Sequence, residues 1–326
     1  MQGLGLNIGL NSRRALTSAK SYKSINKQTA FERYFLLKVP KARFFVSKNV
    51  NLYYHVCVLF SEYFPAEYAD GILNNSAYRQ QHEHLKTESL HQKFQNLWQY
   101  SYYAWDFVGK SLSEADTMSS TKETLVRASQ DQMDIWLQIL SEALPSYEPI
   151  WSGIEGKLEE YKARFEAEWN AIHETVLTKM SKIAKLPWKT EHLNVHFVDC
   201  VYGAQSWVED VVVPPFPDID IEKKLLSHEI AHTLVPDYFL KTKLQKFNLD
   251  CSIAHTIVDL IAYFGVKEHV TDPERRGIKP NPNYYAEVSK LYPIFEDYYK
   301  NLVQYQKFDD ILKQISERSK DKEGQH

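Results

Sequence analysis

The sequence predicts an α+β protein that is mainly helical, with a helical N-terminal region and a C-terminal region that holds a small β-sheet. Two observations support this class. Apolar residues recur at helical spacing through much of residues 82–185, whereas two segments of strand character follow at 193–213. The composition agrees, because 11 Gly and 13 Pro stand against 21 Tyr, 16 Phe and 7 Trp, which favours a helix-rich, aromatic core.

Composition and charge describe an ordinary soluble globular chain of 326 residues, with 44% hydrophobic residues, 25% charged residues and a net charge of −3. No basic excess indicates a nucleic-acid partner. No apolar run approaches the roughly 20 residues needed to span a bilayer, so no membrane span is expected. Oligomeric state is left open. We divide the chain into a flexible basic tail (1–30), a mainly helical region (31–190) and a C-terminal domain (191–326).

The first 31 residues contain no Asp or Glu but carry five basic residues. This pattern favours a flexible tail, and an organelle transit peptide is the alternative. Three widely spaced cysteines, Cys57, Cys200 and Cys251, form neither a disulfide framework nor a zinc-binding spacing. We therefore expect a reducing, cytoplasmic location, or an organellar one if the tail is a transit peptide.

The helical region begins with mixed patterning and then turns strongly apolar. Its predicted segments are a strand or short helix within 31–50, a buried helix at 51–63, a loop at 64–80, and helices near 82–112, 121–143 and 151–185. The last of these has the clearest apolar stripe, with charged residues opposite it, and Pro187 is expected to end it.

The C-terminal domain begins with alternating apolar residues at 193–198, followed by a second strand at 207–213. Asp218 or Asp220 is expected to cap the helix that follows. The remaining predictions are helices near 249–266, 283–303 and 306–318 and a charged tail at 319–326. His192 and His196 flank the first strand, and we expect both to be surface residues.

The most informative pattern is His228-Glu229-Ile230-Ala231-His232. On a helix, positions i and i+4 lie one above the other, so His228 and His232 are both able to reach one metal ion. Glu229 lies on the neighbouring flank, where its carboxylate is placed to hold a water molecule on that metal. Two imidazoles and an adjacent carboxylate suit a zinc hydrolase.

A catalytic zinc usually has three protein ligands and one open position. The next apolar helix carries His255 and Asp259, which are four residues apart and share a face. Buried polar residues in an apolar helix require partners. A metal site satisfies both of them, one as a ligand and the other as a partner of a ligand.

This pattern, a strand, an HExxH helix and a ligand helix over about residues 191–268, resembles the gluzincin branch of the zincin metallopeptidases. In aminopeptidase-like members the third ligand is a Glu with an Ala three residues on. Here Asp259 precedes Ala262 at that offset, with 26 residues between His232 and Asp259. The resemblance therefore favours Asp259 as the third ligand. The alternative takes His255 as ligand and Asp259 as its supporting carboxylate, as in thermolysin-like members with His in place of Glu.

The resemblance implies a zincin-like catalytic domain and a zinc-dependent metallopeptidase that acts on peptide or protein substrates. Glu229 is then the general base, Zn2+ is the cofactor, and the strand at 207–213 lines the cleft and holds an extended peptide. The alternative is a catalytically inactive, metal-binding scaffold or binding protein of peptidase-like fold. Cleavage specificity and the residue that stabilises the oxyanion are not determined by the sequence.

Overall fold

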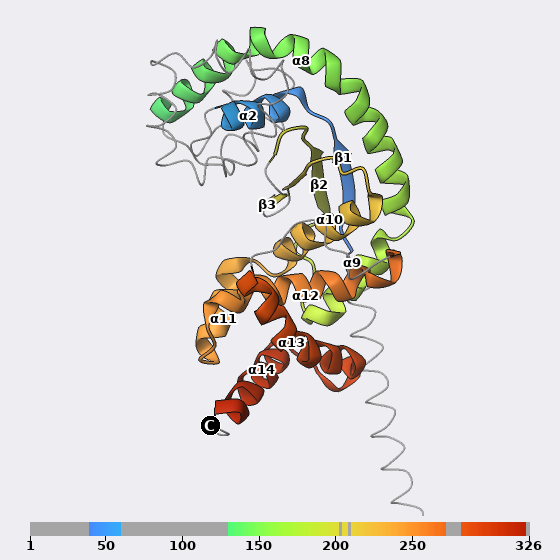
Figure 1. The fold of residues 1–326 in the computed structure, drawn as a ribbon, viewed down its shortest axis with the longest axis vertical. Helices are drawn as coiled ribbons and strands as arrows, with labels where there is room; N and C mark the ends of the chain where they lie inside the picture. Colours follow the sequence, from blue (N-terminus) through green and yellow to red (C-terminus); the bar gives the residue numbers. More distant parts are fainter. Residues whose placement is uncertain (1–38, 60–129, 202–203, 208–209, 272–281, 324–326) are drawn as a thin grey trace, which may run out of the picture.

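The computed structural model describes residues 39–59, 130–201, 204–207, 210–271 and 282–323. They form a mainly helical fold with one four-stranded sheet, which confirms the predicted α+β class (Figure 1). The basic tail at 1–30, the predicted loop at 64–80 and the helix at 82–112 lie outside the described residues.

The sheet has the order β1-β2-β4-β3. Its strands are β1 (Lys41–Phe45), β2 (His192–Phe197), β3 (Gln205–Trp207) and β4 (Asp210–Val213). β1, β2 and β4 run parallel, and β3 pairs antiparallel with β4 at one edge. β1 belongs to the predicted helical region and β2 to the predicted C-terminal domain, so the sheet draws strands from both.

A second strand was predicted as one segment at 207–213, and this is wrong. Trp207 ends β3, and the chain reverses before Asp210 begins β4, with Trp207 paired to Asp210 in an antiparallel register. The apolar run Val211–Val213 is buried because β4 lies between β2 and β3. An apolar run indicates that a segment is buried. It does not indicate where the chain reverses direction between β3 and β4.

One face of the sheet is aromatic and packs against the long helix α8 (Gln130–Asn170). Phe44 of β1 is paired in register with Val195 of β2, so the two side chains share this face with Phe197. The Phe165 ring of α8 lies 5.9 Å from that of Phe44 and 5.7 Å from that of Phe197, both edge-on. Edge-to-face pairs of this kind add to the stabilisation from apolar burial.

Helix α8 was predicted as two helices, one ending near 143 and one spanning 151–185, and both boundaries are wrong. The helix continues through Pro145 and Pro149, and Figure 1 shows it arching over the sheet. Proline lacks the N–H for one helical hydrogen bond and bends a helix. Here the buried Tyr147 and Trp151 carry the apolar stripe across the prolines. The break falls instead before α9 (His173–Ala184).

Helix α2 (Lys48–Leu59) covers the described part of the helix predicted at 51–63, begins three residues earlier, and packs against α8. Asn51 joins α2 to the end of β2, since its amide nitrogen donates to the Phe197 carbonyl at 3.0 Å and its oxygen accepts from Asp199 N–H at 2.9 Å. Tyr54 donates from its hydroxyl to Gln205 Oε1 of β3 at 2.9 Å. The two contacts fix α2 over one end of the sheet.

The lower part of the molecule in Figure 1 is helical. Its main helices are α10 (Ile219–Leu234), α11 (Asp237–Lys246), α12 (Ala254–Val266), α13 (Pro282–Lys300) and α14 (Phe308–Glu323). Short 3-10 helices lie at Cys251–Ile253, Lys267–His269 and Leu302–Gln304. α11 was not predicted, because its sequence is too polar for a clear apolar stripe. α14 runs into the segment predicted as a charged tail.

Within the described ranges, no helix combines the length and the apolar character that crossing a bilayer requires, and this includes the 41-residue α8.

Gly265 of α12 lies against Met180 of α9, and a methyl group at this position would meet Met180 Cγ at 2.7 Å. We therefore expect Gly265→Ala to lower the free energy of unfolding by about 1–3 kcal/mol, the usual cost of overpacking a core. Gly153→Ala in α8 is the matched control. Its new methyl group meets nothing within 4 Å, so better helix propensity should stabilise it by about 0.5–1 kcal/mol. Urea unfolding measures both, and equal stability of wild type and Gly265→Ala would refute the close contact.

Candidate metal centre

Helix α10 carries the HExxH motif and is anchored at both ends. Asp218 caps it by accepting from Asp220 N–H at 3.0 Å, so Asp218 is the cap and Asp220 is not. Leu226, Ile230 and Leu234 are buried on the side of the helix that faces the core. Because α12 and the edge strand β3 both pack on α10, the helix is held between the sheet and the C-terminal helices.

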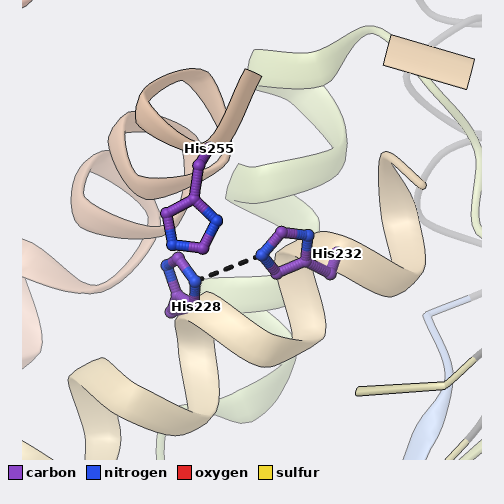
Figure 2. A group of neighbouring side chains, drawn as sticks. All are labelled: His228, His232 and His255. Atoms are coloured by element: carbon purple, nitrogen blue, oxygen red, sulfur yellow. Dashed lines mark hydrogen bonds between the residues drawn. The ribbon is translucent and has the colours of Figure 1, made fainter. Parts of the chain in front are cut away.

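His228 and His232 lie on one face of α10, as the spacing predicts. Their Nε2 atoms face each other at 3.2 Å, and Figure 2 shows the two rings turned toward one another. Two nitrogens that each lie about 2.0–2.1 Å from a tetrahedral zinc ion would be about 3.3–3.4 Å apart. The observed separation therefore fits a shared metal ion.

His255 enters the same space from α12, as Figure 2 shows. One ligand nitrogen from each of His228, His232 and His255 lies within 4.8 Å of the others. The His255 ring centroid is 4.6 Å from that of His228 and 5.1 Å from that of His232. His255 is exposed and the other two are partly buried, so the group is open to solvent on the His255 side.

Asp259 occupies a different place from the one the sequence favoured for it. Its Oδ1 lies 2.5 Å from Nδ1 of His228, the ring nitrogen opposite the one that faces His232. Asp259 therefore contacts the outer side of His228, and the group of possible metal ligands includes His255 and not Asp259. The three residues that could hold one metal ion are those of the alternative assignment, His228, His232 and His255.

A second carboxylate, which the sequence analysis missed, contacts the other motif histidine. Asp237 Oδ1 lies 3.1 Å from Nδ1 of His232. Asp237 is the first residue of α11, five positions after His232, where Pro236 separates α10 from α11. In the sequence, Pro236 followed by Asp237 indicates the start of a helix. It does not indicate that the Asp237 side chain contacts His232.

The surroundings of His228 and His255 shift the pKa values of these two rings in opposite directions. Burial acts to lower the pKa of His228, but the contact with Asp259 outweighs it and the pKa is raised above 6.5. Partial burial of the ring and the charge of His228 lower the pKa of His255 to about 4. The hydrogen bond with His232 lowers the pKa of Asp237. His255 is thus neutral at physiological pH, the form that binds a metal.

Glu229 is 7% exposed and lies one residue after His228 on α10. Its charge also acts on Tyr54 of α2. Burial is the main cause of the raised pKa of Tyr54, and the charges of Tyr53, Cys57, Glu229 and Asp210 raise it further. A buried tyrosine from the N-terminal part of the chain therefore lies in the electrostatic neighbourhood of the predicted general base. Sequence reasoning had no signal for Tyr54, since a separation of 175 residues hides the proximity.

The strand predicted to line the cleft, at 207–213, does not lie at an edge of the sheet for most of its length. Most of the predicted 207–213 segment is β4, which is hydrogen-bonded to β2 on one side and β3 on the other. β4 therefore has no backbone edge to offer an extended peptide. β3 is the outer strand of the described sheet on this side, and it contacts α10.

The polar face of the sheet contains a third histidine–carboxylate pair, outside the group of three histidines. His196 Nε2 lies 3.4 Å from Asp210 Oδ1, and Asn194 donates to the same oxygen at 3.0 Å. His196 is 2% exposed, so the expectation of a surface residue is wrong. Asp210 explains the burial, because a paired polar group tolerates an interior position. His192 is half-buried and lies 2.8 Å from Arg43 Nη2.

Comparison with known proteins returns no relative: no family model, no curated protein and no solved structure matches the chain.

Glu222 is a buried carboxyl group in the first turn of the motif helix, and it binds the chain segment that leads into this helix. Its Oε2 accepts from Phe216 N–H at 3.2 Å, and Phe216 N–H lies equally close to the Tyr161 hydroxyl of α8. Burial raises the pKa of Glu222 to about 8, although Phe216 and Tyr161 act to lower it. Glu222 is therefore largely protonated in the folded protein at neutral pH.

We expect Glu222→Gln to remove a pH-dependent loss of stability. Between the ordinary pKa of 4.5 and the folded value of about 8, the unfolded chain releases a proton that the folded chain retains. Wild type therefore loses stability as pH rises through this window, by up to about 1.4 kcal/mol per pH unit, and the loss levels off above it. Glutamine keeps the acceptor and cannot ionise.

Urea unfolding of both proteins at pH 5, 6, 7 and 8 tests this. The stability of Glu222→Gln relative to wild type should rise steadily with pH. Parallel profiles for the two proteins would show that Glu222 ionises normally.

Proposed function

We propose that the protein is a zinc-dependent metallopeptidase, with His228, His232 and His255 as metal ligands and Glu229 as general base. The observation that carries the proposal is the convergence of three imidazoles from α10 and α12, with Glu229 next to His228 on α10. His255 comes from a separate helix, and no local spacing requires it to meet the motif pair. Three protein ligands with an open fourth position are typical of catalytic zinc sites.

The donor set fits zinc. Imidazole suits zinc, as it does copper, iron and nickel, and Nδ1 of His228 and of His232 each has a carboxylate neighbour that directs Nε2 inward. When bound, zinc would polarise the scissile carbonyl and lower the pKa of a coordinated water molecule. Three neutral imidazole ligands would not reduce the 2+ charge of the ion, so the full charge would act on the carbonyl and on the water molecule.

Glu229 supplies the proton transfers. Its carboxylate follows His228 directly on α10 and is largely buried beside the candidate metal ligands. In this role Glu229 takes a proton from the attacking water molecule and delivers it to the leaving amine. A site without turnover has no physical need for a buried carboxylate at this position.

The edge strand β3 supports a peptide as the substrate class. An extended peptide adds to an outer strand through backbone hydrogen bonds. Among the described strands, β3 is the one that is both at an edge of the sheet and in contact with the motif helix. Tyr54 holds β3 through Gln205, which keeps the edge in place beside α10.

Glu229→Gln separates catalysis from metal binding. We expect zinc content to stay at the wild-type level, while cleavage of a peptide library, followed by mass spectrometry, falls about 10²–10⁴-fold, the usual contribution of a general base. Zinc in both proteins with no cleavage by wild type would favour a metal-binding protein without peptidase activity. Absence of zinc from both would refute the site.

His255→Ala and Asp259→Ala distinguish the two possible third ligands. We expect His255→Ala to abolish stoichiometric zinc, and Asp259→Ala to retain zinc with about 10–100-fold weaker affinity. His192→Ala is the control, because His192 lies in β2 and contacts Arg43. The opposite result, with zinc lost in Asp259→Ala and kept in His255→Ala, would restore Asp259 as the ligand.

A further inference from the structure

We propose that Asp237 is a positioning residue that fixes the metal-binding form of His232. This inference rests on the proposed function, since it assigns a second supporting carboxylate to the same centre. Asp259 supports His228 from α12, whereas Asp237 supports His232 from α11. Each motif histidine thus has a carboxylate of its own, from a different helix.

The chain brings Asp237 to His232 by a sharp change of direction. α10 ends at Leu234, and Val235 and Pro236 adopt non-helical conformations before α11 begins at Asp237. Pro236 cannot donate a backbone hydrogen bond to extend α10. The new helix therefore starts beside the last turn of the old one, and its first side chain reaches the ring of His232.

The two nitrogens of His232 have different neighbours. Nδ1 lies 3.1 Å from Asp237 Oδ1, and Nε2 lies 3.2 Å from Nε2 of His228. A carboxylate next to Nδ1 keeps the proton on that nitrogen, so the lone pair on Nε2 points toward the other imidazoles. The same carboxylate holds the plane of the ring and increases the basicity of Nε2 as a ligand.

The alternative role for Asp237 is that of an ordinary acidic residue at a helix start. A carboxylate in the first turn of α11 interacts favourably with the helix dipole, and half of the Asp237 side chain is exposed. That role predicts a small effect on folding stability and no effect on metal affinity. A positioning role predicts a large effect on affinity and on the ligand field of the metal.

The experiment compares Asp237→Asn, Asp237→Ala and Asp237→Glu with wild type in the full-length protein. Asp250→Asn is the matched control, because Asp250 is also an exposed aspartate at the start of a helical segment, and its carboxylate accepts from Ser252 N–H rather than contacting His232. Zinc affinity is measured by competition with a chromophoric chelator. Cobalt substituted for zinc reports ligand geometry through its visible absorption bands, and urea unfolding of the metal-free proteins reports stability.

We expect Asp237→Asn and Asp237→Ala to weaken zinc binding about 10–100-fold and to shift the cobalt bands, with little change in metal-free stability. Asp237→Glu should recover part of the affinity, and Asp250→Asn should match wild type. Wild-type affinity and an unchanged cobalt spectrum in Asp237→Asn would overturn the proposal.

The test of Asp237 and the test of peptidase activity are able to fail independently. If wild type binds zinc but cleaves no peptide, the peptidase assignment fails while the affinities still decide the role of Asp237. If wild type binds no zinc or cobalt, both proposals fail together.

Discussion

The contact between α10 and α12 is the constraint on which the candidate site depends. Two of the three candidate ligands lie on one helix and the third on the other, so they come together only where the helices meet at close range. Ile230 of α10 and Ile257 and Ile261 of α12 are fully buried, and their burial holds the helices together. Gly265 of α12 allows the close approach of α9 behind them. Apolar packing thus sets the positions of polar ligands.

A second level of organisation is electrostatic. Three imidazoles crowded together repel one another when protonated, which is one cause of the low pKa of His255. Asp259 and Asp237 offset that repulsion and turn the motif rings so that Nε2 faces inward. In the proposed centre, a bound metal ion would supply positive charge in the middle of this arrangement. The carboxylates outside and the imidazoles inside are therefore parts of one centre.

The region before residue 190 contributes more to the site than its sequence indicates. β1 completes the sheet, α8 covers its aromatic face, and α2 reaches the edge strand through Tyr54 and Gln205. Glu222, at the start of the motif helix, is buried against Tyr161 of α8. The helical region thus supports both the edge of the sheet and the beginning of α10.

The sequence by itself determined the fold class, the motif helix with a cap at Asp218 or Asp220, and the histidine pair, because each depends on spacing within a few residues. It narrowed the third ligand to His255 or Asp259, which share a helix face. Only the tertiary structure favoured His255, since the choice depends on how α12 is rotated against α10. Asp237, the hairpin before β4 and the proximity of Tyr54 to Glu229 were likewise decided by contacts between elements, which local periodicity does not encode.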